Sequence, residues 1–179
     1  MIRQDLQYPI GEFQTPNQIH TELLETWITE IRQFPVQLEE LITHSPPLSE
    51  EWKYRPNGWN IRQLVHHCAD SHMNSFIRFK LALTEENPSI LPYQEALWAN
   101  VPDTQNAPIQ SSLTLLHGLH QRWVILLQSL SKGQLNRTFY HPANKKSITL
   151  CENTGIYAWH CRHHLAHVKL ALDAKGKWN

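Results

Sequence analysis

Apolar residues recur at intervals of three and four over four long stretches of this chain, the spacing that places side chains on one face of an α-helix. The stretches cover about residues 16–44, 60–86, 109–131 and 149–176. Amphipathic helices of this length bury their apolar faces most simply against one another. The sequence therefore predicts an all-α protein whose fold class is a four-helix bundle.

Capping signals indicate where three of the helices begin. A cap residue is followed three positions later by glutamine or glutamate at Thr15–Gln18, Asn60–Gln63 and Thr149–Glu152. Pro16 would occupy the first helical position of the first helix. Inside that helix Pro35 lacks an N–H, which predicts a kink or a break. Gly133 stands where a C-terminal glycine would end the third helix.

The segments between the helices predict two further features. Residues 137–141 and 147–150 flank a polar turn, which indicates a short β-hairpin before the last helix. Residues 87–109 hold four prolines and no helical period, which predicts a long structureless connection of the kind that often forms a lid. We expect Tyr93 and Trp98 to pin it to the body. Residues 1–15 read as an N-terminal arm, and 1–179 as a single domain.

Composition excludes several functional classes. Lys+Arg and Asp+Glu both number 16, so the chain has no basic excess of the kind that nucleic-acid binders carry. No apolar run approaches the ~20 residues of a membrane helix, and the N-terminus has no apolar signal core. Three cysteines, an odd number, fit free thiols in a reducing compartment. We expect a cytoplasmic protein that binds neither nucleic acid nor membrane.

Histidine is the residue in excess, with 12 in the chain. Four lie within the last helical stretch, at His160, His163, His164 and His167. On a helical projection His164 falls within the buried stripe and His160 lies beside it one turn earlier, whereas the other two lie further out. A histidine pair at i and i+4 projects two imidazoles from one face, a geometry that can chelate one metal ion.

A third ligand would come from a facing helix, and spacing alone leaves its identity open. His66 points away from the second apolar stripe, His67 lies at its edge and His72 lies within it, while His120 lies near the apolar face of the third helix. Cys161 follows His160 where a zinc protease has its glutamate, so protease chemistry is disfavoured. Cys68 and Cys161 on buried stripes are expected to act as small hydrophobes.

Five segments together resemble the DinB-like superfamily of four-helix bundles, and its YfiT branch in particular. They are residues 55–59 (RPNGW), 65–74 (VHHCADSHMN), 78–88 (RFKLALTEENP), 139–142 (FYHP) and 157–167 (YAWHCRHHLAH). The resemblance runs over nearly the whole chain. It implies a metal triad of His67 from the second helix with His160 and His164 from the fourth, holding one divalent ion, zinc or nickel. It also implies a homodimer.

The resemblance implies a metal-dependent hydrolase that acts on a small molecule. A second possibility on the same site is a transferase for a low-molecular-weight thiol, since related proteins have been associated with bacillithiol transfer. A third is a non-catalytic metal-binding or haem-binding bundle. Three neutral imidazoles leave open positions on the ion, as in catalytic sites. His163, Asp70 and His141 are candidates for a general base.

Overall fold

Four long α-helices make up most of residues 5–179, the part of the chain that the computed structural model describes. They are α1 (Thr21–Thr43), α2 (Ile61–Thr84), α5 (Ile109–Ser129) and α7 (Leu150–Ala174). A two-stranded antiparallel hairpin, β1 (Thr138–His141) and β2 (Lys146–Thr149), precedes α7, with Thr138 opposite Thr149. The predicted all-α four-helix bundle with a hairpin before the last helix is therefore confirmed. No helix in residues 5–179 is long and apolar enough to cross a membrane.

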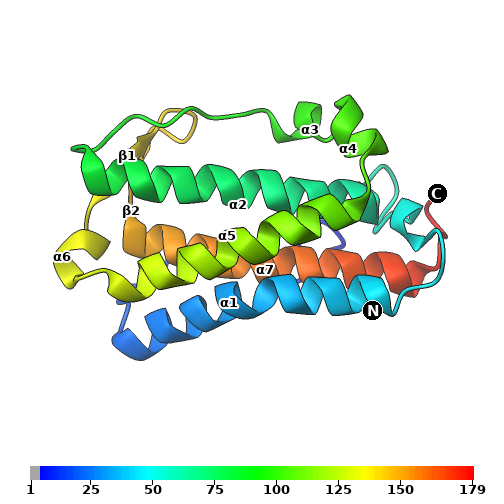
Figure 1. Cartoon of the computed structure of the whole chain (residues 1–179), viewed down its shortest axis with the longest axis horizontal. Helices are drawn as coiled ribbons and strands as arrows, with labels where there is room; N and C mark the ends of the chain where they lie inside the picture. Colours follow the sequence, from blue (N-terminus) through cyan, green and yellow to red (C-terminus); the bar gives the residue numbers. More distant parts are fainter. Residues whose placement is uncertain (1–4) are drawn as a thin grey trace.

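The four long helices do not pack in chain order. Helix α1 packs against α5 and α7, and α2 packs against the same two helices, so α1 and α2 lie on opposite corners of the bundle. Figure 1 shows α2 above and α1 below, with α5 in front and α7 behind. Fully buried side chains such as Ile31, Phe34, Leu64, Leu116 and Val168 fill the space between them. Each side chain of this kind contributes roughly 1.5–3 kcal/mol through burial.

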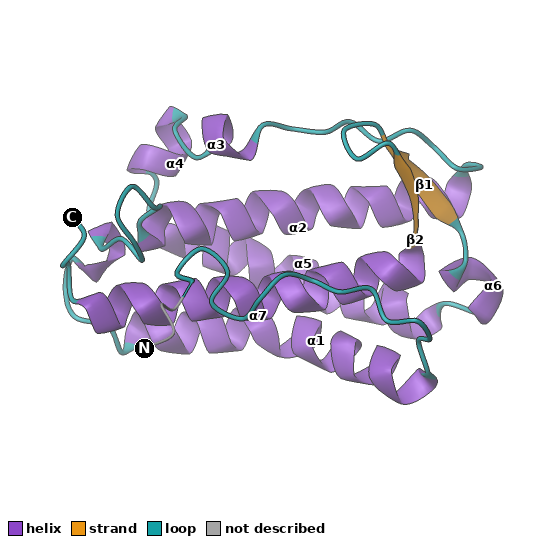
Figure 2. Cartoon of the chain, turned by 180° about the vertical axis from the view of Figure 1, so that it is seen from behind, coloured by secondary structure: helices purple, strands orange, loops and turns teal. Residues whose placement is uncertain are grey.

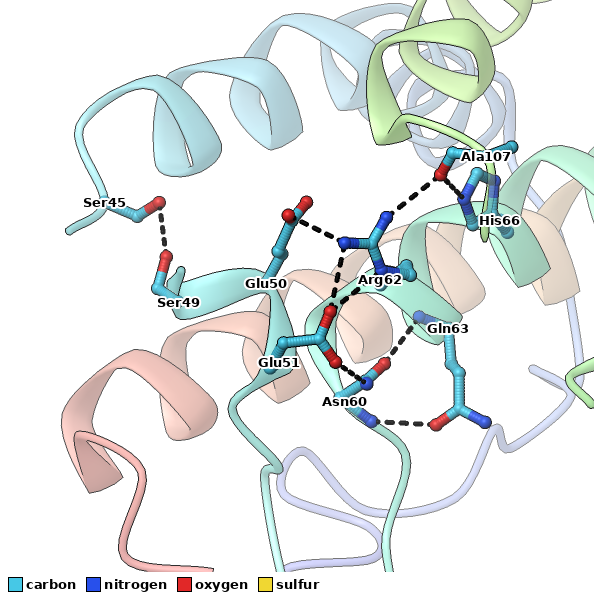
Figure 3. Close-up of polar contacts among 9 residues, drawn as sticks. All are labelled: Ser45, Ser49, Glu50, Glu51, Asn60, Arg62, Gln63, His66 and Ala107. Carbon is cyan, nitrogen blue, oxygen red and sulfur yellow. Dashed lines mark hydrogen bonds and ion pairs between the residues drawn. The ribbon is translucent and has the colours of Figure 1, made fainter. Parts of the chain in front are cut away.

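Helix α2 begins where the sequence predicts, and polar contacts hold that end in place. The Asn60 side chain accepts from the Gln63 amide, and the Gln63 side chain accepts from the Asn60 amide, so the capping box is complete. Arg62 pairs with Glu50 at 2.7 Å and Glu51 at 3.0 Å, both on the short helix η1 (Ser49–Glu51) (Figure 3). These contacts anchor α2 to the end of α1.

The predicted start of the first helix is wrong. Helix α1 begins at Thr21 with His20 as its cap. Thr15 instead donates its hydroxyl to the Glu152 carboxylate on α7, a tertiary contact that the local capping pattern could not reveal. The predicted break at Pro35 is also absent, because α1 continues through this buried proline.

The end of the third helix and the start of the fourth were predicted in part. Gly133 does not end α5; it lies inside a separate short helix, α6 (Lys132–Leu135). Thr149 accepts from the Glu152 amide at 3.0 Å as predicted. The Glu152 carboxylate pairs with Lys146 instead of closing the capping box.

The 87–109 connection is not structureless, which corrects the prediction. It contains two short helices, α3 (Glu95–Trp98) and α4 (Pro102–Asn106), and runs back along the outside of α2 (Figures 1 and 2). Side chains of α2 hold it: Gln63 donates to the Ala99 carbonyl and Arg62 to the Ala107 carbonyl. Trp98 packs on Tyr93 with ring centroids 4.5 Å apart but remains 38% exposed. The connection is thus held by polar groups of α2, by buried side chains such as Ile90 and by backbone hydrogen bonds to Tyr140 of β1, whereas Trp98 is only partly covered.

The described part of the N-terminal arm, residues 5–15, lies along the outer face of α7 (Figure 2). Its backbone carbonyls accept from side chains of that helix: Gly11 from Trp159 and Gln7 from His167. Residues 1–4 of the predicted arm lie outside the described residues. The arm covers the part of α7 that carries the histidines.

Gly155 of α7 packs directly against the side chain of Trp27 on α1. A Cβ at this position would lie 2.7 Å from the buried Trp27 ring. We expect Gly155→Ala to cost about 1–3 kcal/mol of unfolding free energy, because the buried Trp27 ring would have to shift to make room for the added methyl group. Urea denaturation measures this loss.

Two variants serve as controls for that prediction. Gly118→Ala on the exposed face of α5 meets no atom within 4 Å, and we expect it to stabilise the protein by roughly 0.5–1 kcal/mol. The Gly155→Ala penalty should shrink in a Trp27→Phe background, because phenylalanine lacks the clashing carbons. An undiminished penalty there would contradict the steric explanation.

Candidate metal centre

Helices α2 and α7 bring three imidazoles together where they pack side by side. His67 projects from α2, and His160 and His164 project from successive turns of α7. The Nε2 atom of His160 lies 3.2 Å from Nε2 of His67 and 3.2 Å from Nε2 of His164. One ring nitrogen from each of the three lies within 4.8 Å of the others. The three lone-pair positions therefore converge on one point.

The spacing fits a small divalent ion. Tetrahedral zinc with Zn–N bonds of ~2.0–2.1 Å separates its nitrogen ligands by about 3.3 Å. The two Nε2–Nε2 separations of 3.2 Å are close to that value. Two unprotonated nitrogens this close repel each other, and a bound cation between them would remove that repulsion. Three imidazoles also suit zinc or nickel better than magnesium or calcium, which prefer oxygen ligands.

Burial keeps the three rings uncharged at neutral pH. Loss of hydration, followed by the charge of His163, lowers the pKa of His67 to about 4. Burial also lowers the pKa values of His160 and His164 well below the usual value of 6.5. Neutral imidazoles keep their lone pairs available for a ligand, whereas protonated ones do not.

The other histidines that spacing left open as third ligands lie elsewhere. His72 and His120 are not part of the convergent group, but His72 contacts it from behind: its Nε2 lies 2.9 Å from Nδ1 of His160. His66 is buried at the edge of the bundle, where its ring bonds to Ser112 and to the Ala107 carbonyl. The structure thus brings together the set that the family resemblance implied.

A cavity of about 460 Å³ opens onto the three rings. Trp59 lies against His67 with ring centroids 4.9 Å apart, and Tyr54 stacks on His167 at 4.0 Å. The remaining polar lining includes Arg55 and Glu95. A volume of this size is typical of small-molecule sites.

Sequence reasoning missed Glu95 and the N-terminal arm as parts of this site. Glu95 lies on α3, within the connection that showed no periodicity, and its place at the cavity depends on how that connection folds back over α2. Gln7 and Tyr8 line the opposite side because the arm lies along α7. No local pattern signals either placement.

Of the three candidates for a general base, only His163 lies at the cavity. His163 lines the cavity, and its buried Nδ1 atom has no hydrogen-bond partner among the described residues. His141 lies in the hairpin, where its ring accepts from the Asn144 amide. Asp70 makes no hydrogen bond to a ligand imidazole in residues 5–179; burial, together with Asp103, raises its pKa to about 6. Neither of these two residues lines the cavity.

The cysteines do not supply a nucleophile to the cavity. Cys68 and Cys161 are free and buried, as predicted, and burial raises the pKa of both thiols. Cys151 is half-buried, and its pKa is raised as well. None of the three lines the cavity within the described part of the chain.

Comparison with known proteins identifies relatives of this chain. The family model described as the DinB superfamily matches residues 30–168. A protein of Bacillus cereus (strain 03BB102) and one of Bacillus anthracis (strain A0248) are each 49% identical over 164 residues, covering 92% of this chain and 94% of theirs. Both carry the name "Putative metal-dependent hydrolase".

A solved structure is similar over almost the whole chain. YfiT from Bacillus subtilis superimposes with a TM-score of 0.91 at 44% identity, covering 97% of this chain and 99% of that chain. It is described as "a probable metal-dependent hydrolase with an unusual four-helix bundle topology". The diagonal placement of α1 and α2 is one respect in which the present bundle departs from simple sequential packing. The resemblance noted from the sequence motifs is confirmed.

The lowered histidine pKa values predict how stability depends on pH in the metal-free protein. The unfolded chain takes up protons below pH 6.5, whereas folded His67 and His120 stay neutral down to about pH 4. The free energy of unfolding should therefore be nearly flat just above pH 7, below the usual thiol pKa of ~8.5, and fall as the pH drops from 6.5 towards 4. Each such histidine contributes up to about 1.4 kcal/mol per pH unit.

Urea unfolding at a series of pH values measures this slope. His120→Gln should reduce the slope between pH 6 and 5 relative to the wild type, because one buried imidazole has been removed. His20→Gln, which replaces an exposed histidine, is the matched control. Equal slopes in His120→Gln and wild type would contradict the assignment of a neutral, buried His120.

Proposed function

The chain belongs to the DinB superfamily, and from that premise we propose that it is a metal-dependent hydrolase acting on a small molecule. His67, His160 and His164 would hold one divalent ion, zinc or nickel, in each chain. The observation that carries the proposal is the convergence of three neutral imidazole nitrogens at the base of an open cavity. Three protein ligands leave positions free for water and substrate.

A bound divalent ion of this kind lowers the pKa of water towards ~7 and polarises a substrate carbonyl or phosphoryl oxygen. The protein's own groups would bind and orient the substrate around that point. Arg55 offers a cation at the cavity wall, and Trp59 offers an aromatic face beside His67. Glu95 and His163 are titratable residues at the cavity that could accept a proton.

Thiol transfer is the second candidate function, and the size of the cavity supports it. A volume of about 460 Å³ is far larger than a water nucleophile needs, so a small thiol and an electrophile could occupy it together. None of the chain's cysteines lines the cavity in residues 5–179, so the thiol would have to be a separate molecule. A bound cation favours the thiolate form just as it favours ionised water.

The geometry gives less support to haem binding, because the three Nε2 atoms converge on one point rather than facing each other across a planar ring. The homodimer, the cytoplasmic location and the absence of nucleic-acid binding remain predictions. Sedimentation of the purified protein would test the first of these.

Elemental analysis of untagged protein tests the metal triad. We expect about one zinc or nickel ion per chain in the wild type and loss of that ion in His67→Ala, His160→Ala and His164→Ala, because two imidazoles bind weakly. His66→Ala removes the neighbouring buried histidine of α2 and should retain the ion. Metal that persists after removal of His67 would rule out this triad and direct attention to His72.

The choice between hydrolysis and thiol transfer can be made with one activated electrophile, supplied to the metal-loaded protein with and without a small thiol. Hydrolysis predicts turnover without thiol and an oxygen-containing product. Product analysis that finds a thioether, formed only when thiol is present, would overturn the hydrolase assignment. The His160→Ala variant, which should lose activity in both cases, controls for the uncatalysed reaction.

A further inference from the structure

His160 is held from behind by two histidines that the proposed triad does not use. Its Nδ1 lies 2.9 Å from Nε2 of His72, and Nδ1 of His72 lies 2.7 Å from Nε2 of His120. We propose that His72 and His120 are positioning residues that fix the tautomer of His160, so that its Nε2 is unprotonated and faces the metal position. The inference rests on the metal site proposed above, and it assigns a role to residues outside that site.

These hydrogen bonds form a relay from His160 through His72 to His120. The relay ends on a backbone carbonyl of α1 that lacks its usual partner within that helix. Nδ1 of His120 lies 2.6 Å from the carbonyl oxygen of Ile31 in α1. In a regular α-helix this oxygen would accept from the N–H of residue 35, but residue 35 is proline and has none. Pro35 therefore leaves a free acceptor on the buried face of α1, and His120 satisfies it.

A carbonyl can only accept, and this fixes the direction of every bond in the relay. His120 must carry its proton on Nδ1, which leaves Nε2 of a neutral ring as an acceptor. His72 then donates from Nδ1 to His120 and accepts at Nε2. His160 in turn donates from Nδ1 to His72, so its lone pair lies on Nε2, the atom that faces His67 and His164.

The surroundings keep the relay rings neutral. His72 is 0% exposed and His120 is 2% exposed. Phe34 lies against both rings, and Trp123 and Tyr157 lie against His72. No carboxylate pairs with either histidine in residues 5–179. A charged imidazole here would be buried without a counter-ion, which is far costlier than a neutral hydrogen-bonded one.

His164 has a shorter relay of the same kind on the other side of α7. Nε2 of His167 lies 3.1 Å from the carbonyl of Gln7, so His167 donates there and accepts at Nδ1. That Nδ1 lies 3.4 Å from Nδ1 of His164, whose lone pair is thereby directed to Nε2. Chains of hydrogen bonds that end on backbone carbonyls thus hold His160 and His164, the two proposed ligands from α7, in the tautomer that can bind one ion.

Pre-set tautomers matter because a free neutral imidazole in water carries its proton mainly on Nε2, the atom needed here as a ligand. A site without the relay would have to rearrange each ring before the ion could bind. Groups that orient a ligand imidazole through its second nitrogen typically contribute 10–100-fold to metal affinity.

The first measurement is the tautomer of His160 in the metal-free wild type, from ¹⁵N chemical shifts of the imidazole nitrogens at pH 7.5. We expect a protonated Nδ1 and an unprotonated Nε2. A proton found on Nε2 would overturn the proposal. Because this readout needs neither metal nor substrate, it is independent of whether the protein is a hydrolase.

The second measurement is the affinity for Zn²⁺ alone, by competition with a chromogenic chelator, in paired variants. His72→Leu breaks the relay and should weaken Zn²⁺ binding by about 10–100-fold, with the His160 proton shifting towards Nε2. His72→Gln keeps one donor and one acceptor and should restore affinity to within about threefold of the wild type. His66→Leu removes a neighbouring buried histidine that contacts no ligand and should bind as the wild type does.

Equal affinities in His72→Leu, His72→Gln and wild type would overturn the proposal, as would an equal loss in His66→Leu. If His72→Leu does not fold, His120→Leu and His120→Gln pose the same question one residue further from the ligand. Wild-type protein that shows the expected tautomer but binds no Zn²⁺ would contradict the proposed metal function while leaving the relay in place.

Discussion

The need to satisfy buried imidazole nitrogens governs the interior of this bundle. Seven histidines in residues 5–179 are buried. A buried polar group without a partner costs free energy comparable to a lost hydrogen bond, and a buried charge costs more. The structure meets this requirement by keeping the rings neutral and linking them to one another and to backbone carbonyls. The Nε2 atoms of His67, His160 and His164 are left facing one another, with no carbonyl or hydroxyl partner among the described residues. Nδ1 of His163 is buried without a hydrogen-bond partner in the same part of the chain.

The bundle's diagonal arrangement makes this linkage possible. Because α5 and α7 each pack against both α1 and α2, a hydrogen-bonded path can run from α1 through α5 and α2 to α7. Each helix contributes one step of that path. The sequence predicts that Pro35 kinks or breaks the helix. In the structure Pro35 leaves the Ile31 carbonyl free, and the path ends on that carbonyl.

Local sequence patterns predicted those features of the fold that depend on residues close together in the chain. The apolar periodicity located the four long helices, and the Asn60–Gln63 spacing located the start of α2 to the residue. Predictions failed where a distant group competed with a local one. Thr15 bonds to Glu152 on α7 rather than capping a helix. The 87–109 connection forms two short helices, and side chains of α2 donate to the carbonyls of Ala99 and Ala107, which follow those helices.

The sequence by itself determined the fold class and the pair His160 and His164, since both follow from the 3.6-residue repeat of a single helix. Helical spacing left open which histidine of α2 meets them, and the motif resemblance implied His67. Only the tertiary structure shows the physical reason: the packing of α2 on α7 brings Nε2 of His67 to Nε2 of His160 and leaves His72 on Nδ1 of the same ring. Packing also gives His67 and His72 different roles. His67 faces the cavity beside Trp59, while His72 is sealed among aromatic rings and supports the site from within.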